Sequence, residues 1–288
     1  MFCCKFKPIF LSLLLFLLFS CANGSFTPST STDTRFIFPA PTGKYFVGTS
    51  SEYYVDKGRS RRPIMVQFWY PAVMKNKASQ YVTNTLYAPE IMELFAEDLK
   101  KKGVQNTEAL KRIAIHSAND MIPSMEVLGK KYPVILFSHG YGMHRRANTA
   151  NCEELASHGY VVIGIDHTNR AKLVVMPDGT RFSLPPSARI EQVQKDYSQD
   201  VKFVLDQINS LQDNIGASAS NSKLIQRINS ILDLNHIGIF GHSRGGQTIL
   251  HMLDADDRLR AGVSLDGLPS SKSEAKKFKK PFIKNPLC

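Results

Sequence analysis

Cysteine is scarce in this chain, which has five in 288 residues. A disulfide-rich scaffold is therefore excluded, and no Cys-x-x-Cys pair lies near histidines as a structural zinc site requires. An apolar run of about 18 residues, the length that spans a membrane, does not occur, which excludes a multi-spanning membrane protein. Hydrophobic residues make up 43% of the chain and charged residues 21%, so disorder and coiled coil are excluded too. The length suffices for one α/β domain with a full core.

Acidic residues are the minority among charged residues, and the formal net charge is +11. Much of the excess lies near the C-terminus, where six lysines accompany Glu274 alone: Lys272, Lys276, Lys277, Lys279, Lys280 and Lys284. Such a segment is either a solvated face or a surface that touches an anionic membrane. No recognition helix or RNA-binding motif accompanies it, so nucleic acid is not an expected partner.

The N-terminus has the pattern of an export signal. Lys5 and Lys7 precede an apolar stretch at 9–19, which is too short to span a bilayer but matches the core of a signal peptide. The residues around Cys21 resemble a bacterial lipobox, in which this cysteine is lipidated after cleavage. Ordinary cleavage after Ala22 is the alternative. We expect an exported protein, either lipid-anchored or secreted to the periplasm or beyond.

Short apolar strands alternate with amphipathic helices along the rest of the chain. Strands are expected at 53–55, 63–70 (closed by Pro71), 132–137, 160–166, 236–240 and 261–265, with another beginning near 280, and helices near 89–102, 107–116, 147–158, 188–211 and 245–254. Continuous apolar strands between helices predict a mostly parallel sheet that is covered on both faces.

A Gly-x-Ser-x-Gly motif follows the expected strand at 236–240. Its Ser243 stands between a buried strand and a helix, the context of a nucleophile elbow. Gly241 and Gly245 lack Cβ atoms, which lets the strand and the helix approach closely around the turn. We therefore expect Ser243 to be a catalytic nucleophile at the carboxyl edge of the sheet.

Acyl transfer also needs donors for the oxyanion and an acid behind the base. The backbone N–H of Arg244 is one expected donor, and that of Tyr141, in the loop after the strand at 132–137, is the other. Asp266 ends a later strand and is the expected acid. Asp166 is the competing carboxylate, but it precedes Ser243 and so departs from the usual order of an α/β-hydrolase.

The motifs together resemble the plasma-type platelet-activating-factor acetylhydrolases and their bacterial dienelactone-hydrolase-like relatives. The resemblance covers roughly residues 43–283 and rests on Gln67-Phe68-Trp69-Tyr70-Pro71, on Ser138-His139-Gly140, on Gly241-His242-Ser243-Arg244-Gly245-Gly246 and on Ser264-Leu265-Asp266. It implies the α/β-hydrolase fold and a calcium-independent serine esterase without cofactor or metal. Its implied substrates are short or oxidised acyl esters of phospholipids or similar small molecules.

Composition and pattern divide the chain into parts. We expect a signal peptide at 1–22, a Ser/Thr/Pro-rich tether at 23–43 and an α/β-hydrolase domain at 44–288, which the resemblance implies is incomplete at its C-terminus. A helical insertion is expected at 73–131, whose apolar stripe lines the cleft, touches lipid or packs on the domain. The sequence does not indicate an oligomeric state.

The expected catalytic histidine is missing. All eight histidines precede Asp266, whereas the family's base follows the acid. His139 is expected to be structural within its loop, and His242 to pack away from the serine. We therefore expect this 288-residue chain to have little esterase activity. The alternative is a non-catalytic, truncated remnant or a lipid-binding surface protein that retains the cleft.

Overall fold

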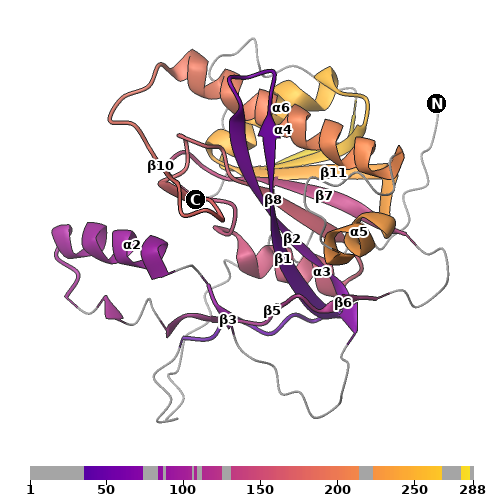
Figure 1. Ribbon diagram of the computed structural model, residues 1–288, viewed down its shortest axis with the longest axis horizontal. Helices are drawn as coiled ribbons and strands as arrows, with labels where there is room; N and C mark the ends of the chain where they lie inside the picture. Colours follow the sequence, from indigo (N-terminus) through magenta and orange to yellow (C-terminus); the bar gives the residue numbers. More distant parts are fainter. Residues whose placement is uncertain are drawn as a thin grey trace. The chain divides into compact units, whose positions relative to one another are not determined.

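The computed structural model describes residues 36–73, 84–86, 89–105, 107–108, 112–124, 131–213, 223–267 and 280–285. The expected signal peptide, Cys21 and most of the C-terminal lysines lie outside these residues. The described helices are α2 (Pro89–Lys101), α3 (Thr149–Ser157), α4 (Ile190–Asp213), α5 (Lys223–Ser230) and α6 (Arg244–Ala255) (Figure 1). None of them is long and apolar enough to cross a membrane.

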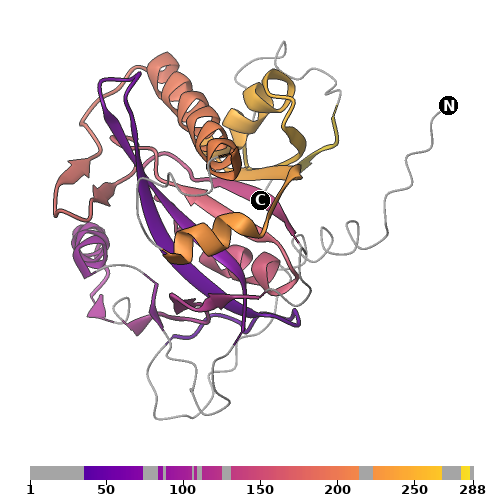
Figure 2. The same cartoon turned by 45° about the vertical axis from the view of Figure 1, so that its right-hand side comes forward.

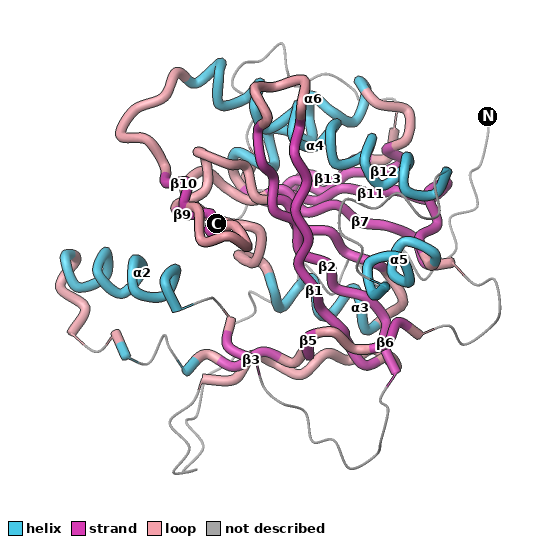
Figure 3. The backbone as a smooth tube through the Cα atoms, viewed as in Figure 1, coloured by secondary structure: helices cyan, strands magenta, loops and turns pink. Residues whose placement is uncertain are grey.

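A nine-stranded sheet forms the centre of the domain (Figure 3). Its strands are β1 (Phe46–Asp56), β2 (Arg62–Val73), β5 (Ala118–Asn119), β6 (Ile122–Pro123), β7 (Tyr132–Ser138), β8 (Val161–Ile165), β11 (Leu232–His242), β12 (Leu259–Leu265) and β13 (Phe282–Asn285). Their spatial order is β13-β12-β11-β7-β8-β2-β1-β5, with β6 paired to β2. Two small sheets pair β3 (Asn84–Thr85) with β4 (Ala114–Ile115), and β9 (Leu173–Val175) with β10 (Arg181–Ser183).

The five strands from β8 to β13 in this order are parallel, whereas β2 runs antiparallel to both β1 and β8. This arrangement confirms the predicted mostly parallel sheet. The carboxyl ends of β7, β8, β11 and β12 consequently lie along one edge. Because β2 runs in the opposite direction, the turn between β1 and β2 lies at that same edge.

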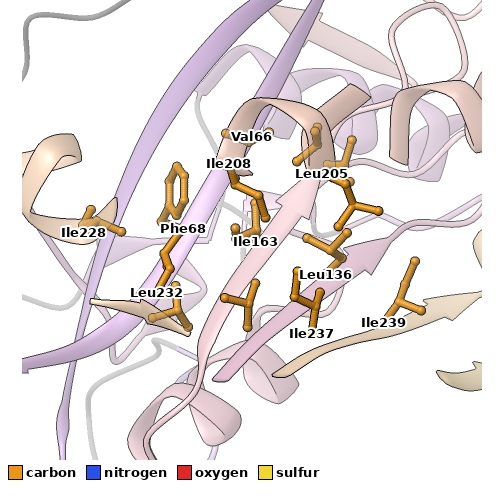
Figure 4. Close-up of a cluster of buried hydrophobic side chains, with 14 of the residues drawn as sticks. Val66, Phe68, Leu136, Ile163, Leu205, Ile208, Ile228, Leu232, Ile237 and Ile239 are labelled. Atoms are coloured by element: carbon orange, nitrogen blue, oxygen red, sulfur yellow. The ribbon is translucent and has the colours of Figure 1, made fainter. Parts of the chain in front are cut away.

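Helices cover both faces of the sheet, as Figures 1 and 2 show for α3 on one face and for α4, α5 and α6 on the other. The apolar face of α4, the helix predicted near 188–211, packs against β2, β7, β8 and β11 (Figure 4). Leu205 and Ile208 are fully buried there together with Phe68 and Ile163. Each such side chain contributes roughly 1.5–3 kcal/mol when it is buried. The residues at the carboxyl edge of the sheet are therefore supported by a well-packed hydrophobic core.

Two local predictions are wrong in part. Of the described residues in the helix expected at 107–116, Glu108 and Arg112 are 3₁₀-helical, whereas Ala114 and Ile115 form β4 instead. Pro71 does not close its strand, because β2 continues to Val73. The missing N–H of Pro71 falls between the last pair with β8, at Trp69, and the first with β6, at Ala72, so no ladder bond is lost.

Several elements had no prediction. The β9–β10 hairpin and α5 lie in stretches to which no helix or strand was assigned, and β11 begins four residues earlier than expected. The described end of the expected tether is bonded to the domain. Ala114 donates its backbone N–H to Phe36 at 2.8 Å, and Thr42 donates its N–H to the Glu154 carboxylate at 2.8 Å. The segment at 36–43 is thus part of the folded unit.

Candidate active site

Ser243 lies in the sharp turn between β11 and α6. Its backbone has φ 49° and ψ −112°, a conformation that is strained for a residue with a side chain. Its N–H donates to the carbonyl of Leu265, at the end of β12, at 2.8 Å. The serine is half-buried, and its hydroxyl has no hydrogen-bond partner within the described chain. This geometry presents the Ser243 Oγ at the edge of the sheet.

Glycines make the turn possible. A Cβ on Gly245 would lie 2.0 Å from the carbonyl oxygen of Ser138, and one on Gly241 would lie 2.6 Å from the carbonyl carbon of Gly245. Helix α6 therefore starts in direct contact with the end of β7. A Cβ on Gly140 would lie 3.4 Å from the Cβ of Ser243, so the loop after β7 passes directly beside the serine.

Two backbone N–H groups at this point have no acceptor among the described residues. One belongs to Arg244, the first residue of α6, where no intrahelical acceptor exists. The other belongs to Tyr141, whereas its neighbour Gly142 donates to the Arg170 carbonyl at 2.9 Å. Unpaired backbone donors beside a serine are what an oxyanion hole requires.

The two candidate acids have different surroundings. Asp266 follows β12, is exposed and has φ 54°, and the bond from Ser243 to Leu265 places it next to the serine turn. Asp166 is fully buried and accepts the backbone N–H and the guanidinium of Arg145. Asp166 therefore braces the chain after β8, and only Asp266 lies exposed at the end of the strand next to the serine.

No histidine bonds to Ser243. All eight lie in described segments: His116, His139, His144, His158, His167, His236, His242 and His251. His242 packs beside Gly140, where a Cβ would approach its Nδ1 to 2.8 Å. His251 is exposed two turns along α6. The structure thus gathers Ser243, Arg244, Tyr141 and Asp266 without a histidine base.

A buried Ser-His-Asp hydrogen-bond chain begins at Ser138, the last residue of β7. Ser138 donates its hydroxyl to His167 Nε2 at 2.9 Å, and His167 donates from Nδ1 to Asp200 Oδ2 at 3.1 Å. Asp200 also accepts two bonds from Arg62, at 2.9 and 3.0 Å, and pairs with Arg59 at 2.7 Å. All three members of the chain have 0% exposure, so no substrate reaches this serine.

Burial and bonding fix the charges in this buried chain. Desolvation would raise the pKa of Asp200, but hydrogen bonds from His167 and Arg62 lower it to about 2. Desolvation lowers the pKa of His167, so its ring is neutral with the proton on Nδ1. His139 accepts the backbone N–H of His167 at Nε2, and desolvation lowers its pKa to about 3. The hydrogen bonds of Ser138, His167 and Asp200 therefore connect the ends of β7 and β8 to α4, and they stabilise the loop that contains Tyr141.

Sequence reasoning did not find this buried chain, although it treated His139 correctly as structural. One signal was available, because Asp200 interrupts the apolar stripe of α4 between Tyr197 and Val201. A carboxylate on the buried face of a helix needs partners. Within the described residues, no cluster of His, Cys, Asp and Glu is suited to hold a metal ion.

Comparisons with known proteins identify relatives of this chain. A curated relative, the platelet-activating factor acetylhydrolase of Canis lupus familiaris, is 30% identical over 163 residues, which are 48% of this chain and 35% of the relative. The probable 1-alkyl-2-acetylglycerophosphocholine esterase of Arthroderma benhamiae is 29% identical over 142 residues, 47% of this chain and 31% of that protein. The chain therefore matches only about a third of these relatives' length.

A solved structure shares the fold over most of the chain. The ferulic acid esterase from Streptomyces cinnamoneus has a TM-score of 0.64 and 26% identity, and the match covers 86% of this chain and 67% of that one. The sequence model of the family described as platelet-activating factor acetylhydrolase, isoform II, matches residues 30–177 and 183–284. With that match over most of its length, and with the α/β-hydrolase sheet and serine turn in place, the chain belongs to the platelet-activating factor acetylhydrolase isoform II family.

Proposed function

We propose that the protein is a serine carboxylic ester hydrolase that removes short or oxidised acyl groups from phospholipids or similar esters through an acyl-enzyme. The observation that supports this most directly is the strained Ser243 turn with the unpaired N–H groups of Tyr141 and Arg244 beside it. Ser243 is the nucleophile. The two N–H groups stabilise the oxyanion, which is among the largest contributions to such catalysis.

Acylation joins Ser243 Oγ to the acyl carbonyl carbon, and the bond to the alcohol oxygen then breaks. A histidine oriented by Asp266 takes the serine proton and delivers it to the leaving alcohol. Water then attacks the acyl-enzyme with the same base and releases the acid. No cofactor or metal takes part in these steps.

The base remains to be supplied, since no histidine of this chain bonds to Ser243. Loss of a triad member commonly lowers turnover by roughly 10⁴–10⁶. We therefore propose that the 288 residues alone have little esterase activity. This observation also favours the second function, a non-catalytic lipid-binding surface protein that retains the cleft.

Because the 288 residues alone are expected to have little activity, hydrolysis of p-nitrophenyl acetate and butyrate is measured in buffer that contains imidazole as an added base, and this assay separates the two functions. Ser243→Ala is compared with Ser210→Ala, which removes an exposed hydroxyl on α4 that bonds only to its own helix. An esterase loses its activity in the first variant and keeps it in the second. Equal rates in all three proteins, at the level of buffer, favour the binding function.

We further propose that the protein is exported and acts at or near a membrane surface. The signal-like pattern at 1–22 supports export, and either lipidation at Cys21 or cleavage after Ala22 would complete it. Labelling with a radioactive fatty acid that is lost in Cys21→Ser identifies the lipid-anchored form. An unlabelled protein that starts after Ala22 identifies ordinary secretion.

A further inference from the structure

A cleft opens at the carboxyl edge of the sheet, between the β1–β2 turn, the loop after β8 and the first turns of α4. Two adjoining cavities of about 470 and 530 Å³ share Arg62, Asn169 and Gln192 in their walls, so they form one continuous cleft. Each cavity is in the size range of small-molecule sites. Arg62 begins β2, three strands from the β11 turn, which is roughly 14 Å at the usual strand spacing.

Positive charge dominates the wall of this cleft. Its ionic side chains are Arg59, Arg62, Arg170, Arg189 and Lys195, against Asp196 alone. Arg59 pairs with Asp56 at 2.5 Å and with the buried Asp200, Arg62 also pairs with Asp200, and Arg170 pairs with Asp196 at 2.7 Å.

The remaining two cations, Arg189 and Lys195, are exposed and have no ion pair with any described residue. One lines each cavity: Lys195 lies in the second turn of α4, and Arg189 directly precedes this helix. Two free cations beside three compensated arginines give the cleft a net positive charge. An anionic ligand is therefore favoured.

Neutral donors complete the cleft on its other sides. Ser60 in the β1–β2 turn, Asn169 after β8 and Ser187 before α4 line it, and their side chains have no partner among the described residues. A phosphate group has several tetrahedral oxygens that accept from different directions, whereas a carboxylate has two in one plane. Donors on three sides fit the phosphate better, and the volume leaves room for the organic group that it esterifies.

We propose that this cleft binds a phosphate ester, with Arg189 and Lys195 as its free cations. The proposal does not depend on hydrolysis at Ser243. The ester has two possible sources: a small soluble phosphate ester, or the headgroup of an anionic phospholipid at a membrane surface.

The test is a titration of the full chain with glycerol 3-phosphate by calorimetry, and with phosphatidylcholine vesicles that do or do not contain phosphatidylglycerol by sedimentation. The variant is Arg189→Gln with Lys195→Gln. The control is Lys202→Gln with Lys223→Gln, which removes the same charge from exposed positions of α4 and α5 outside the cleft. Circular dichroism verifies that both variants fold.

The proposal predicts saturable binding that weakens by roughly tenfold or more in the cleft variant and stays within about twofold in the control. Loss for glycerol 3-phosphate identifies a soluble ester, and loss for the anionic vesicles alone identifies a headgroup. The proposal is overturned if neither probe binds saturably, or if the cleft and control variants lose affinity equally, because attraction is then a matter of total charge.

Discussion

The turn at Ser243 depends on close contacts between backbone atoms that leave no space for a side chain on Gly245. The carbonyl oxygen of Ser138 occupies the space that a side chain on Gly245 would need. Gly238, earlier in β11, has its nearest such neighbour, the Ala261 oxygen, at 3.7 Å, which is an ordinary contact. Two glycines of the same segment therefore differ sharply in the room around them.

Gly245→Ala is expected to lower the free energy of unfolding by about 1–3 kcal/mol, because the methyl group forces α6 away from β7. Gly238→Ala is the matched control and is expected to leave stability almost unchanged, since its methyl group has space and the unfolded chain loses entropy. Urea unfolding midpoints measure both. Equal midpoints for the two variants would mean that α6 does not start against Ser138.

The sequence pattern allowed more residues of the candidate site to be predicted than of the buried hydrogen-bond network. Ser243, Arg244, Tyr141 and Asp266 could be named because a strand, a turn and a helix in sequence order determine which atoms meet. The Ser138–His167–Asp200 chain could not, because its members come from three elements that are adjacent only in the folded sheet.

Buried histidines make the segment after β7 sensitive to acid. Desolvation lowers the pKa of both His139 and His144 to about 3, whereas the unfolded chain has the ordinary value of 6.5. Below pH 6.5 the unfolded state therefore binds protons that the folded state does not. The free energy of unfolding should fall as the pH falls from about 6.5 towards 3, by up to ~1.4 kcal/mol per pH unit for each histidine. Asp200, with its pKa of about 2, adds a further loss below about pH 4.

Urea midpoints between pH 8 and 4 measure this slope. His144→Gln should make this slope shallower by about the contribution of one histidine. A midpoint that does not change from pH 7 to 4.5 would contradict neutral, buried histidines.

Long periodic elements were predictable, and short ones were not. Helix α4 and strands β7 and β8 have enough residues for a period to show, and the structure confirms them. The insertion at 73–131 shows the limit, because β3 to β6 have two residues each and follow from tertiary pairing alone. On α2 the stripe is partly packed, with Ile91 buried and the Phe95 ring 5.7 Å from that of His144. Contact of this helix with lipid stays a prediction.

At the scale of the whole molecule, the proposed site combines groups from the ends of several strands, and its contacts among the described residues include no histidine bonded to Ser243. The sheet order brings the ends of β7, β11 and β12 together, and with them the proposed nucleophile Ser243, the proposed oxyanion donors and Asp266. Among the residues that the structure describes, no pair of hydrogen bonds links Asp266 through a histidine to Ser243. The proposed site therefore folds without a histidine bonded to the serine. A base added from solution tests whether the other groups of the site can support catalysis.

Imidazole should raise the Ser243-dependent hydrolysis of p-nitrophenyl acetate by this chain. Ser243 is half-buried and Asp266 is exposed, so a small base can reach both. A positioned base has an effective concentration of roughly 10⁵ M or more, and free imidazole should therefore recover only a small part of the missing rate. Ser243→Ala gives the hydrolysis by imidazole itself, which is subtracted, and Asp266→Asn should reduce the recovery because the ring is no longer oriented. If the chain instead turns over rapidly without imidazole, one of its eight histidines must move to the serine, and the base has been assigned to the wrong part of the protein.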